Sequence, residues 1–274
     1  MSECNHDCEH CASNDSCETK SLKAKLNELS HIKRIIGILS GKGGVGKSYV
    51  TSLLAVSLIK RGFKVGILDA DVTGPSIPKA FNIGEKAAGE NSLIYPLSSR
   101  LGIKIISANC LLEDDSDPII WRGPLLANLV KQFYEDVLWE ELDYLLIDMP
   151  PGTGDVALTI FQSIPVDDLI IVTSPQDLVS LIVTKAIKMA EMMHINVLGV
   201  IENMSYLTCP DCGKKIEVFG TSHLDSFAKQ LHFNILGRLP LNSQNASLVD
   251  EGRVEEIALP EIEEVTNKIL TKEN

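Results

Sequence analysis

Short runs of apolar residues alternate with longer amphipathic segments along most of the chain. The runs are rich in Val, Ile and Leu and do not alternate with polar residues, as expected for strands buried on both faces of a sheet. They read RIIGILS, KVGILDAD, IKIISAN, YLLIDMP, LIIVTSP, NVLGVIEN and FNILGRLP. Between them the pattern predicts helices at residues 48–60, 125–138, 178–193 and 224–231. This alternation predicts an α/β fold with a mainly parallel sheet and helices on both faces.

The same pattern predicts one domain over residues 21–274, preceded by a tail of residues 1–20. Apart from Met1 and the cysteines, the tail has no apolar residue larger than Ala, so only a bound metal could organise it. Leu22, Leu26 and Leu29 predict a short amphipathic helix over residues 21–32. Two polar stretches, residues 82–100 and 208–215, are predicted to be excursions from the sheet.

Composition and charge narrow the range of partners. The 274 residues include 37 Asp and Glu against 25 Lys and Arg, and the net charge of -12 would repel a nucleic acid backbone. No apolar run approaches the roughly 20 residues of a membrane-spanning helix, and the first ten residues are polar and acidic rather than a signal peptide. We therefore expect a cytoplasmic protein without nucleic acid or membrane partners.

A phosphate-binding motif occupies residues 40–48, SGKGGVGKS, which satisfies the pattern G-x4-G-K-[ST]. It follows an apolar strand and opens a helix, so backbone N–H groups and the helix N-terminus can surround a phosphate. Lys47 would neutralise the β- and γ-phosphates of ATP, and Ser48 would ligate Mg²⁺. The predicted nucleotide-binding residues are Gly41, Lys42, Gly43, Gly44, Val45, Gly46, Lys47, Ser48 and Tyr49.

Acidic residues end two of the predicted strands, where ligands gather in open α/β sheets. Asp69 and Asp71 follow KVGIL, and Asp148 follows YLLI. A carboxylate at such a position can hold Mg²⁺ through water or orient the attacking water in phosphoryl transfer. Asp69 could serve the metal or cap its strand, whereas Asp155 is interpreted as the acid at a helix N-terminus.

The run KGGVGKS, with its early lysine, resembles the deviant Walker A motif of the MinD, ParA and nitrogenase iron protein class of P-loop ATPases. The resemblance implies that Lys42 reaches the phosphates of the partner in a nucleotide-sandwich homodimer. It also implies that Asp71 orients the water, and that Asp148 joins Ser48 and Asp71 around Mg²⁺. Lys42, Lys47 and Asp71 would then form the catalytic set of a slow ATPase. Asn203, with the strand end near Pro240, matches the place where this class contacts adenine.

Six of the seven cysteines fall into two groups, one in the tail and one formed by Cys209 and Cys212. Cys110 stands alone beside an apolar run and is predicted to be buried. The C-x2-C pair is half of a zinc or iron–sulfur site, because such sites generally need four ligands. A twofold axis, the tail cysteines or a zinc ribbon could complete it. The twofold axis is the economical answer because Lys42 independently suggests a dimer.

The segment SYLTCPDCGKKIEVFG, taken with DADVTGPSIP, WRGP and DMPPGTGD, closely resembles the Mrp/ApbC/Nbp subfamily of iron–sulfur cluster carrier ATPases. The resemblance runs from about residue 33 to about residue 264. It implies that Cys209 and Cys212 hold a labile [4Fe–4S] cluster that bridges two subunits and is handed to apo-proteins. Zinc at the same pair remains chemically open, since thiolates suit both metals.

The tail offers a further group of thiols in the pattern C-x3-C-x2-C-x5-C, formed by Cys4, Cys8, Cys11 and Cys17. The spacing from Cys8 to Cys17 resembles the N-terminal cluster motif of the eukaryotic Nbp branch, whereas the position of Cys4 departs from it. The tail is thus a candidate for a second cluster or for zinc.

Other functions remain compatible with these motifs. A MinD- or ParA-like positioning ATPase with a structural zinc at the C-x2-C would need a membrane-binding tail or a basic face, and the C-terminus EEVTNKILTKEN is neither strongly basic nor strongly amphipathic. An electron-transfer ATPase would keep its cluster and reduce a partner. A nucleotide-gated adaptor would bind ATP without hydrolysing it.

Overall fold

The computed structural model describes residues 23–71, 76–90, 93–111, 123–175 and 179–271. The main sheet contains the strands β1 (His31–Ser40), β2 (Val65–Asp69), β5 (Leu97–Ser98), β6 (Lys104–Ser107), β7 (Glu141–Asp148), β8 (Asp168–Thr173), β9 (Asn196–Thr208), β10 (Lys215–Ile216) and β11 (Ile235–Pro240). The α-helices are α1 (Lys47–Lys60), α2 (Ser76–Ala80), α3 (Gly123–Asp136), α4 (Asp155–Ser163), α5 (Val179–Met192), α6 (Leu224–Leu231), α7 (Ser243–Asp250) and α8 (Pro260–Thr271).

The main sheet has the strand order β10-β9-β8-β1-β7-β2-β6-β5, and β11 pairs with β9. Strands β1, β2, β6, β7, β8, β9 and β11 pair in parallel, whereas β5 and β10 are antiparallel to their neighbours. Two further short strands, β3 (Gly89–Glu90) and β4 (Leu93–Ile94), form a separate antiparallel pair. The predicted mainly parallel α/β fold is confirmed.

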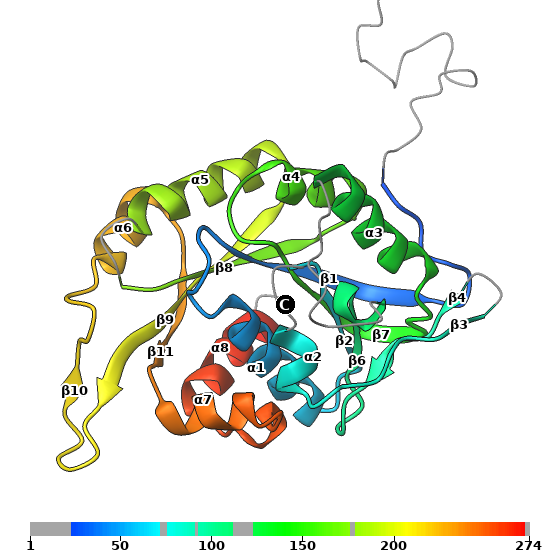
Figure 1. The fold of residues 1–274 in the computed structure, drawn as a ribbon. Coiled ribbons are helices and arrows are strands. Elements are labelled where there is room, and N and C mark those ends of the chain that lie inside the picture. The colour runs from blue at the N-terminus through cyan, green and yellow to red at the C-terminus, as the bar shows by residue number, and fades with distance from the viewer. Residues whose placement is uncertain (1–22, 72–75, 91–92, 112–122, 176–178, 272–274) are drawn as a thin grey trace, which may run out of the picture.

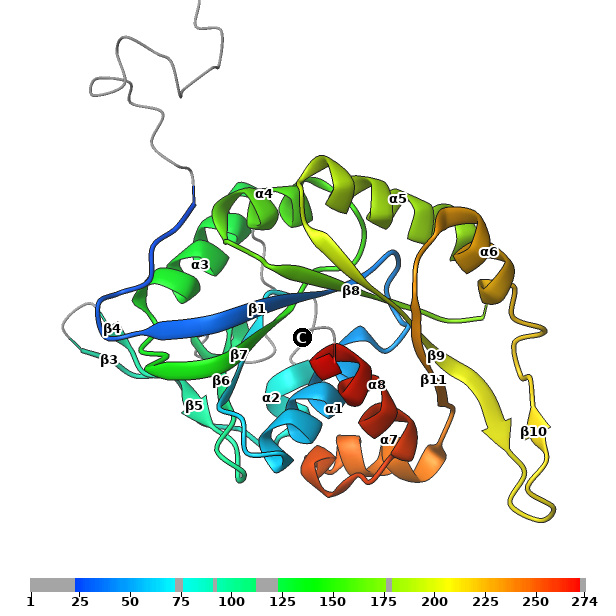
Figure 2. The same ribbon diagram turned by 180° about the vertical axis from the view of Figure 1, so that it is seen from behind.

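Two layers of helices cover the sheet (Figures 1 and 2). Helices α3, α4, α5 and α6 lie on one face, and α1, α2, α7 and α8 lie on the other. Each face of the sheet has its own hydrophobic core, and successive residues of β1 pack into different ones. Leu39 packs into the core beneath α3, α4, α5 and α6, and Ile38 packs into the core on the opposite face. This two-sided burial explains the continuous apolar runs in the sequence. Among the described residues, no helix is long and apolar enough to span a bilayer.

The register of the central strands aligns polar side chains at one end of the sheet. Asp148 at the end of β7 lies beside Ile38 of β1 on one side and beside Asp69 of β2 on the other. Asp69 in turn lies beside Ser107 at the end of β6. Parallel strands thus bring residues from distant parts of the chain to the edge where β1 gives way to α1.

The predicted helix over residues 21–32 is wrong for its described part. Residues 23–30 are irregular, and β1 begins at His31. The side-chain amide of Asn27 donates to the backbone oxygens of Glu135 and Val137, while its oxygen accepts from the backbone of Leu29. Such side-chain to backbone bonds offer this short segment an alternative to helical pairing.

The two polar stretches, residues 82–100 and 208–215, were predicted to leave the sheet, but each contributes to a short strand at its edge. β5, within residues 82–100, joins the sheet as an antiparallel edge next to β6. β10 pairs with the last residues of β9, so the stretch 208–215 belongs to a hairpin that prolongs the sheet. Backbone pairing at a sheet edge does not need apolar side chains, which is why the hydrophobic pattern does not reveal it.

Candidate functional site

The phosphate loop adopts a conformation that requires glycine. Gly44 and Gly46 have φ values of 80° and 79°, in the left-handed region that other residues rarely adopt. Nothing lies within 4 Å of the positions where Cβ atoms would stand on Gly43 and Gly44. Helix α1 begins directly after Gly46 and has no acidic residue in its first turn. The loop is therefore open around Gly43 and Gly44 and leads into a helix N-terminus, a setting that suits a phosphate.

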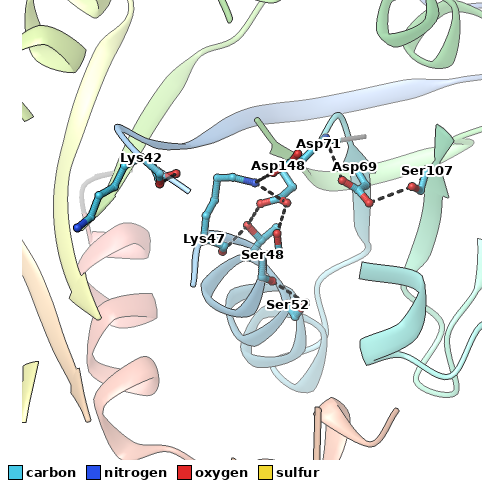
Figure 3. A network of polar contacts seen from close by, with 10 residues as sticks. Lys42, Lys47, Ser48, Ser52, Asp69, Asp71, Ser107 and Asp148 are labelled. Atoms are coloured by element: carbon cyan, nitrogen blue, oxygen red, sulfur yellow. Dashed lines mark hydrogen bonds and ion pairs between the residues drawn. The ribbon is translucent and has the colours of Figure 1, made fainter. Parts of the chain in front are cut away.

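Asp148 is the centre of a buried polar cluster at the start of α1 (Figure 3). Its carboxylate accepts hydrogen bonds from Lys47 Nζ at 2.7 Å, Ser48 Oγ at 2.6 Å and Thr51 Oγ1 at 2.7 Å. Lys47 Nζ also lies 3.3 Å from Asp71 Oδ2. Burial acts to lower the pKa of Lys47, but the charges of Asp148 and Asp71 outweigh it and raise that pKa. Lys47 is thus held as a cation, ready to neutralise phosphate charge.

Asp69 lies behind this cluster and is fully buried. Burial, together with the nearby charge of Asp148, raises the pKa of Asp69 well above its ordinary value, against the opposing effects of Lys47 and Ser107. Its oxygens accept a hydrogen bond from Ser107 Oγ at 2.9 Å and from the backbone N–H of Asp71 at 3.1 Å. Asp69 therefore links β6 to the start of the segment that carries Asp71.

A cavity of about 280 Å³ opens beside the loop. Residues 43–49 of the loop form one wall, and Asp71 and Pro151 contribute to the others. Tyr49 is half-buried at this cavity, where its hydroxyl accepts a hydrogen bond from the Asn245 amide at 3.2 Å. The side chain of Lys42 points away from the Lys47–Asp148 cluster, as Figure 3 shows.

Strand β9 contacts the phosphate loop through Asn203. The side-chain amide of Asn203 donates to the backbone oxygen of Val45 at 2.9 Å. A Cβ on Gly46 would come within 2.3 Å of the same amide nitrogen, so glycine is also needed there for close approach. The role of Asn203 as an adenine contact remains a prediction, and its observed contact is with the loop itself.

The residues predicted to hold Mg²⁺ converge in space. Ser48 Oγ bonds directly to Asp148, and Asp71 reaches the same cluster through Lys47. One hydroxyl and two carboxylates form an all-oxygen donor set, which is the set that Mg²⁺ prefers beside nucleotide phosphates. The side chains present therefore fit this metal.

The C-x2-C pair lies in a hairpin, residues 206–216, which we call the thiol hairpin. The Cys209 N–H donates to the Lys214 oxygen at 2.9 Å, and the Gly213 N–H donates to the Cys209 oxygen at 2.9 Å. Hydrogen bonds from the backbone N–H groups of Cys212 and Asp211, then from the Cys212 side chain, lower the pKa of Cys209. A thiolate is the form that binds metal. The described residues contain no group of three or more His, Cys, Asp or Glu side chains that could hold a metal ion.

The remaining predicted residues lie away from the phosphate loop cluster or outside the described residues. Cys110 is buried, as predicted, and Asp155 begins α4 behind Gly154. The tail cysteines Cys4, Cys8, Cys11 and Cys17 lie outside the described residues. Sequence reasoning missed Thr51 and Ser107. Thr51 could have been found, because it follows Lys47 by four residues and so shares its face of the helix.

Comparisons with known proteins agree with this geometry. The family described as ParA, NUBPL iron-transfer P-loop NTPase, matches residues 31–272. An iron-sulfur cluster carrier protein of Clostridium perfringens is 46% identical over 266 residues, covering 91% of this chain and 93% of that protein. One from Methanocaldococcus jannaschii is 48% identical over 261 residues, covering 92% and 90%.

Solved structures extend the likeness. A nucleotide-binding protein of Archaeoglobus fulgidus, in complex with ADP, is 44% identical with a TM-score of 0.76, covering 84% of this chain and 90% of that one. The cell division ATPase MinD of Pyrococcus furiosus is 19% identical with a TM-score of 0.64, covering 88% and 99%, and supports the fold alone. The resemblance to the carrier ATPases is confirmed, and the chain belongs to the iron-transfer P-loop NTPases of the ParA class.

Proposed function

We propose that this protein binds and slowly hydrolyses ATP, assembles a labile [4Fe–4S] cluster between two copies of the chain, and delivers the cluster to apo-proteins. The observation that carries the proposal is the position of two thiols, Cys209 half-buried and Cys212 exposed, on a hairpin whose strand also contacts the phosphate loop. Strand β9 joins Asn203, bonded to Val45, to Cys209, whose pKa is lowered. The names of the carrier proteins of C. perfringens and M. jannaschii support the same cargo.

In the proposed nucleotide reaction, Lys47 and the N–H groups of residues 43–48 bind the phosphates. Ser48, Asp71 and Asp148 would hold Mg²⁺, which would supply charge neutralisation at the phosphates. Asp71 orients a water for in-line attack on the γ-phosphorus, and the bond to the ADP oxygen breaks. Lys42 of a second copy completes the phosphate contacts, since its side chain turns away from the cluster in its own chain.

The cargo site is proposed to need the same dimer. Cys209 and Cys212 supply two thiolates, and a cubane cluster needs four ligands. The end of β1 and the thiol hairpin lie toward the same side of the molecule in Figure 1, so a second copy that docks on that side would be near both sites. ATP would change how this face is held and therefore how tightly the cluster is kept.

Anaerobic reconstitution with iron and sulfide tests the cargo. The full-length chain would be compared with Cys209→Ala and with a variant whose Cys4, Cys8, Cys11 and Cys17 are all serine, measuring iron, labile sulfide and mass. We expect about four irons per dimer, retained in the tail variant and lost in Cys209→Ala. A wild-type protein that is purified with zinc and takes up no iron would contradict the carrier function.

Hydrolysis is tested separately with Asp71→Asn, measuring ATP binding and phosphate release. Loss of the carboxylate should lower turnover by about 100-fold while leaving ATP bound, because one positioned polar group contributes about 10² to 10⁴ to such a step. Unchanged turnover would favour a nucleotide-gated adaptor.

A further inference from the structure

Glu202 is a buried carboxylate on β9, one position before Asn203. Its side chain is only 1% exposed. One of its oxygens accepts a hydrogen bond from Ser205 Oγ at 2.6 Å, and the other accepts a hydrogen bond from Ser222 Oγ. The oxygen that faces Ser205 also lies 3.4 Å from Arg238 Nε. A buried carboxylate holds such partners in fixed positions, because the loss of any of them would leave part of its charge unsatisfied.

Two partners of Glu202 connect it to the part of the chain that leaves the thiol hairpin. Residues 217–223, which we call the return segment, run from β10 back to α6 (Figure 1). Ser222 belongs to this segment. Arg238 of β11 also bonds to Asp225 of α6 at 2.7 Å. Glu202 therefore ties β9 to the return segment directly and to α6 through the guanidinium of Arg238.

The next residue of the strand, Asn203, contacts the phosphate loop. Its amide donates to the Val45 oxygen at 2.9 Å, and a Cβ on Gly46 would collide with the same amide. A movement of the loop toward β9 would therefore displace Asn203, because closely packed groups transmit displacement. Successive strand residues point to opposite faces, so Asn203 and Glu202 connect the loop on one face with the return segment on the other.

Strand β9 is bulged directly after these two residues. Glu202 is aligned with Arg238 of β11. The next aligned pair is Tyr206 and Pro240, so β9 has three residues in an interval where β11 has one. Within this interval Met204 has a φ of 55°, in the left-handed region. Such a backbone persists only where the surrounding contacts determine it. The stretch between the loop and the thiol hairpin is thus shaped by side-chain contacts more than by regular strand pairing.

We propose that Glu202 is a positioning residue for the thiols, which transmits the state of the phosphate loop to the thiol hairpin. Bound nucleotide favours the arrangement in which the loop and Asn203 are in contact. The bulge carries this preference to Glu202, which fixes the return segment through Ser222. The return segment should therefore open less often when nucleotide is bound. This inference rests on the proposed function, because it names the residues through which nucleotide would act on the cluster site.

Amide hydrogen exchange of the full-length protein, without iron, tests the proposal. Exchange in the return segment is measured with and without ADP and Mg²⁺, at a protein concentration where nucleotide leaves the mass unchanged. In wild type we expect ADP to slow this exchange by about fivefold or more. Ser222→Ala and Glu202→Gln should abolish the slowing while ADP still binds, and Ser222→Thr, which keeps the hydroxyl, should retain it. The matched control is Ser226→Ala, whose lost hydroxyl bonds to the His223 oxygen rather than to β9 and which should behave as wild type.

Other outcomes have separate meanings. A purely structural role of Glu202 would speed exchange equally with and without ADP and keep the slowing, and that result overturns the proposal. So does a wild-type chain that binds ADP without slowing, whereas iron uptake by the same chain would leave the carrier function standing. A chain that shows the slowing but takes up no iron overturns the cluster and keeps the role of Glu202.

A second route from the hairpin to the body is tested with Tyr206→Phe. This change removes the hydrogen bond from the Tyr206 hydroxyl to Glu261 of α8, at 2.6 Å, and leaves the contacts of Glu202 in place. We expect the slowing by ADP to persist in this variant. Slowing that is lost in Tyr206→Phe and survives in Ser222→Ala would mean that the coupling passes through α8, and it would overturn the role of Glu202.

Discussion

The phosphate loop and the thiol hairpin lie toward the same side of the molecule in Figure 1, but their side chains differ in burial and in bonding. At the loop, Lys47 is only 5% exposed, and Asp148 is fully buried among three donors from α1. On the hairpin, Cys212 is exposed, and the side chains around the thiols reach into solvent. At the first site, one chain brings the proposed Mg²⁺ ligands Ser48, Asp71 and Asp148 together around Lys47. At the second, the described residues offer two thiols and no group of three metal-binding side chains, so the proposed cluster would need further ligands.

The largest change at the phosphate loop is expected from Lys47→Ala. It removes charge-assisted contacts to phosphate, so ATP affinity should fall by about 100-fold or more. It also leaves Asp148 buried without its cation, which should lower the free energy of unfolding by about 3 kcal/mol. Fluorescent nucleotide titration and urea unfolding measure the two effects. The control Lys33→Ala removes an exposed ion pair with Asp143 and should leave ATP binding unchanged. If Lys47→Ala bound ATP within threefold of wild type, Lys47 would not be a phosphate-binding residue.

The next test uses pH. Burial and the charge of Asp148 raise the pKa of Asp69 in the folded protein above its ordinary value of 3.8. Between pH 3.8 and the raised pKa, the folded protein therefore binds more protons at Asp69 than the unfolded chain does. The stabilisation from this group is complete below pH 3.8 and is lost as pH rises through the folded pKa. Asp69→Asn should flatten this decline in urea midpoints measured across acidic to neutral pH. Parallel pH profiles for the two proteins would contradict a buried, protonated Asp69.

A smaller effect on the free energy of unfolding is expected from Thr51, which bonds to Asp148 inside the buried polar cluster. Thr51→Val keeps the shape of the side chain but removes a hydrogen bond to Asp148, which should cost about 2 kcal/mol of unfolding free energy. Ser57, on the same helix, is the matched control. Its buried hydroxyl has no hydrogen-bond partner among the described residues, so Ser57→Ala should be neutral or slightly stabilising. Equal losses in both variants would mean that helix packing, not Asp148, sets the cost.

The smallest expected effect is on the hairpin. Because backbone N–H groups lower the pKa of Cys209, it should react with iodoacetamide about threefold faster than Cys212 near neutral pH. Peptide mapping of the reduced full-length protein gives both rates. Buried Cys110 should stay unlabelled until the protein unfolds, which reports that the fold is intact. Equal rates at Cys209 and Cys212 would argue against a preformed thiolate site.

The two sites also differed in how far the sequence could predict them. The loop was predictable because glycine, lysine and serine at fixed spacing follow a buried strand and open a helix. Thr51 and Ser107 were missed because their roles depend on the register of β7, β2 and β6, which no local pattern specifies. The helix expected over residues 21–32 failed because Asn27 bonds to residues more than 100 positions away. Helices α2, α7 and α8 lay outside the predicted elements.

The contact between Asn203 and Val45 joins residues 158 positions apart in the chain. During synthesis the phosphate motif emerges early, but the strand that closes one side of its loop is made only when about three quarters of the chain exists. Folding of this site is therefore governed by a long-range pairing rather than by the local motif. A ribosome-bound chain that stops before residue 203 would have the whole phosphate motif without the support that shapes it.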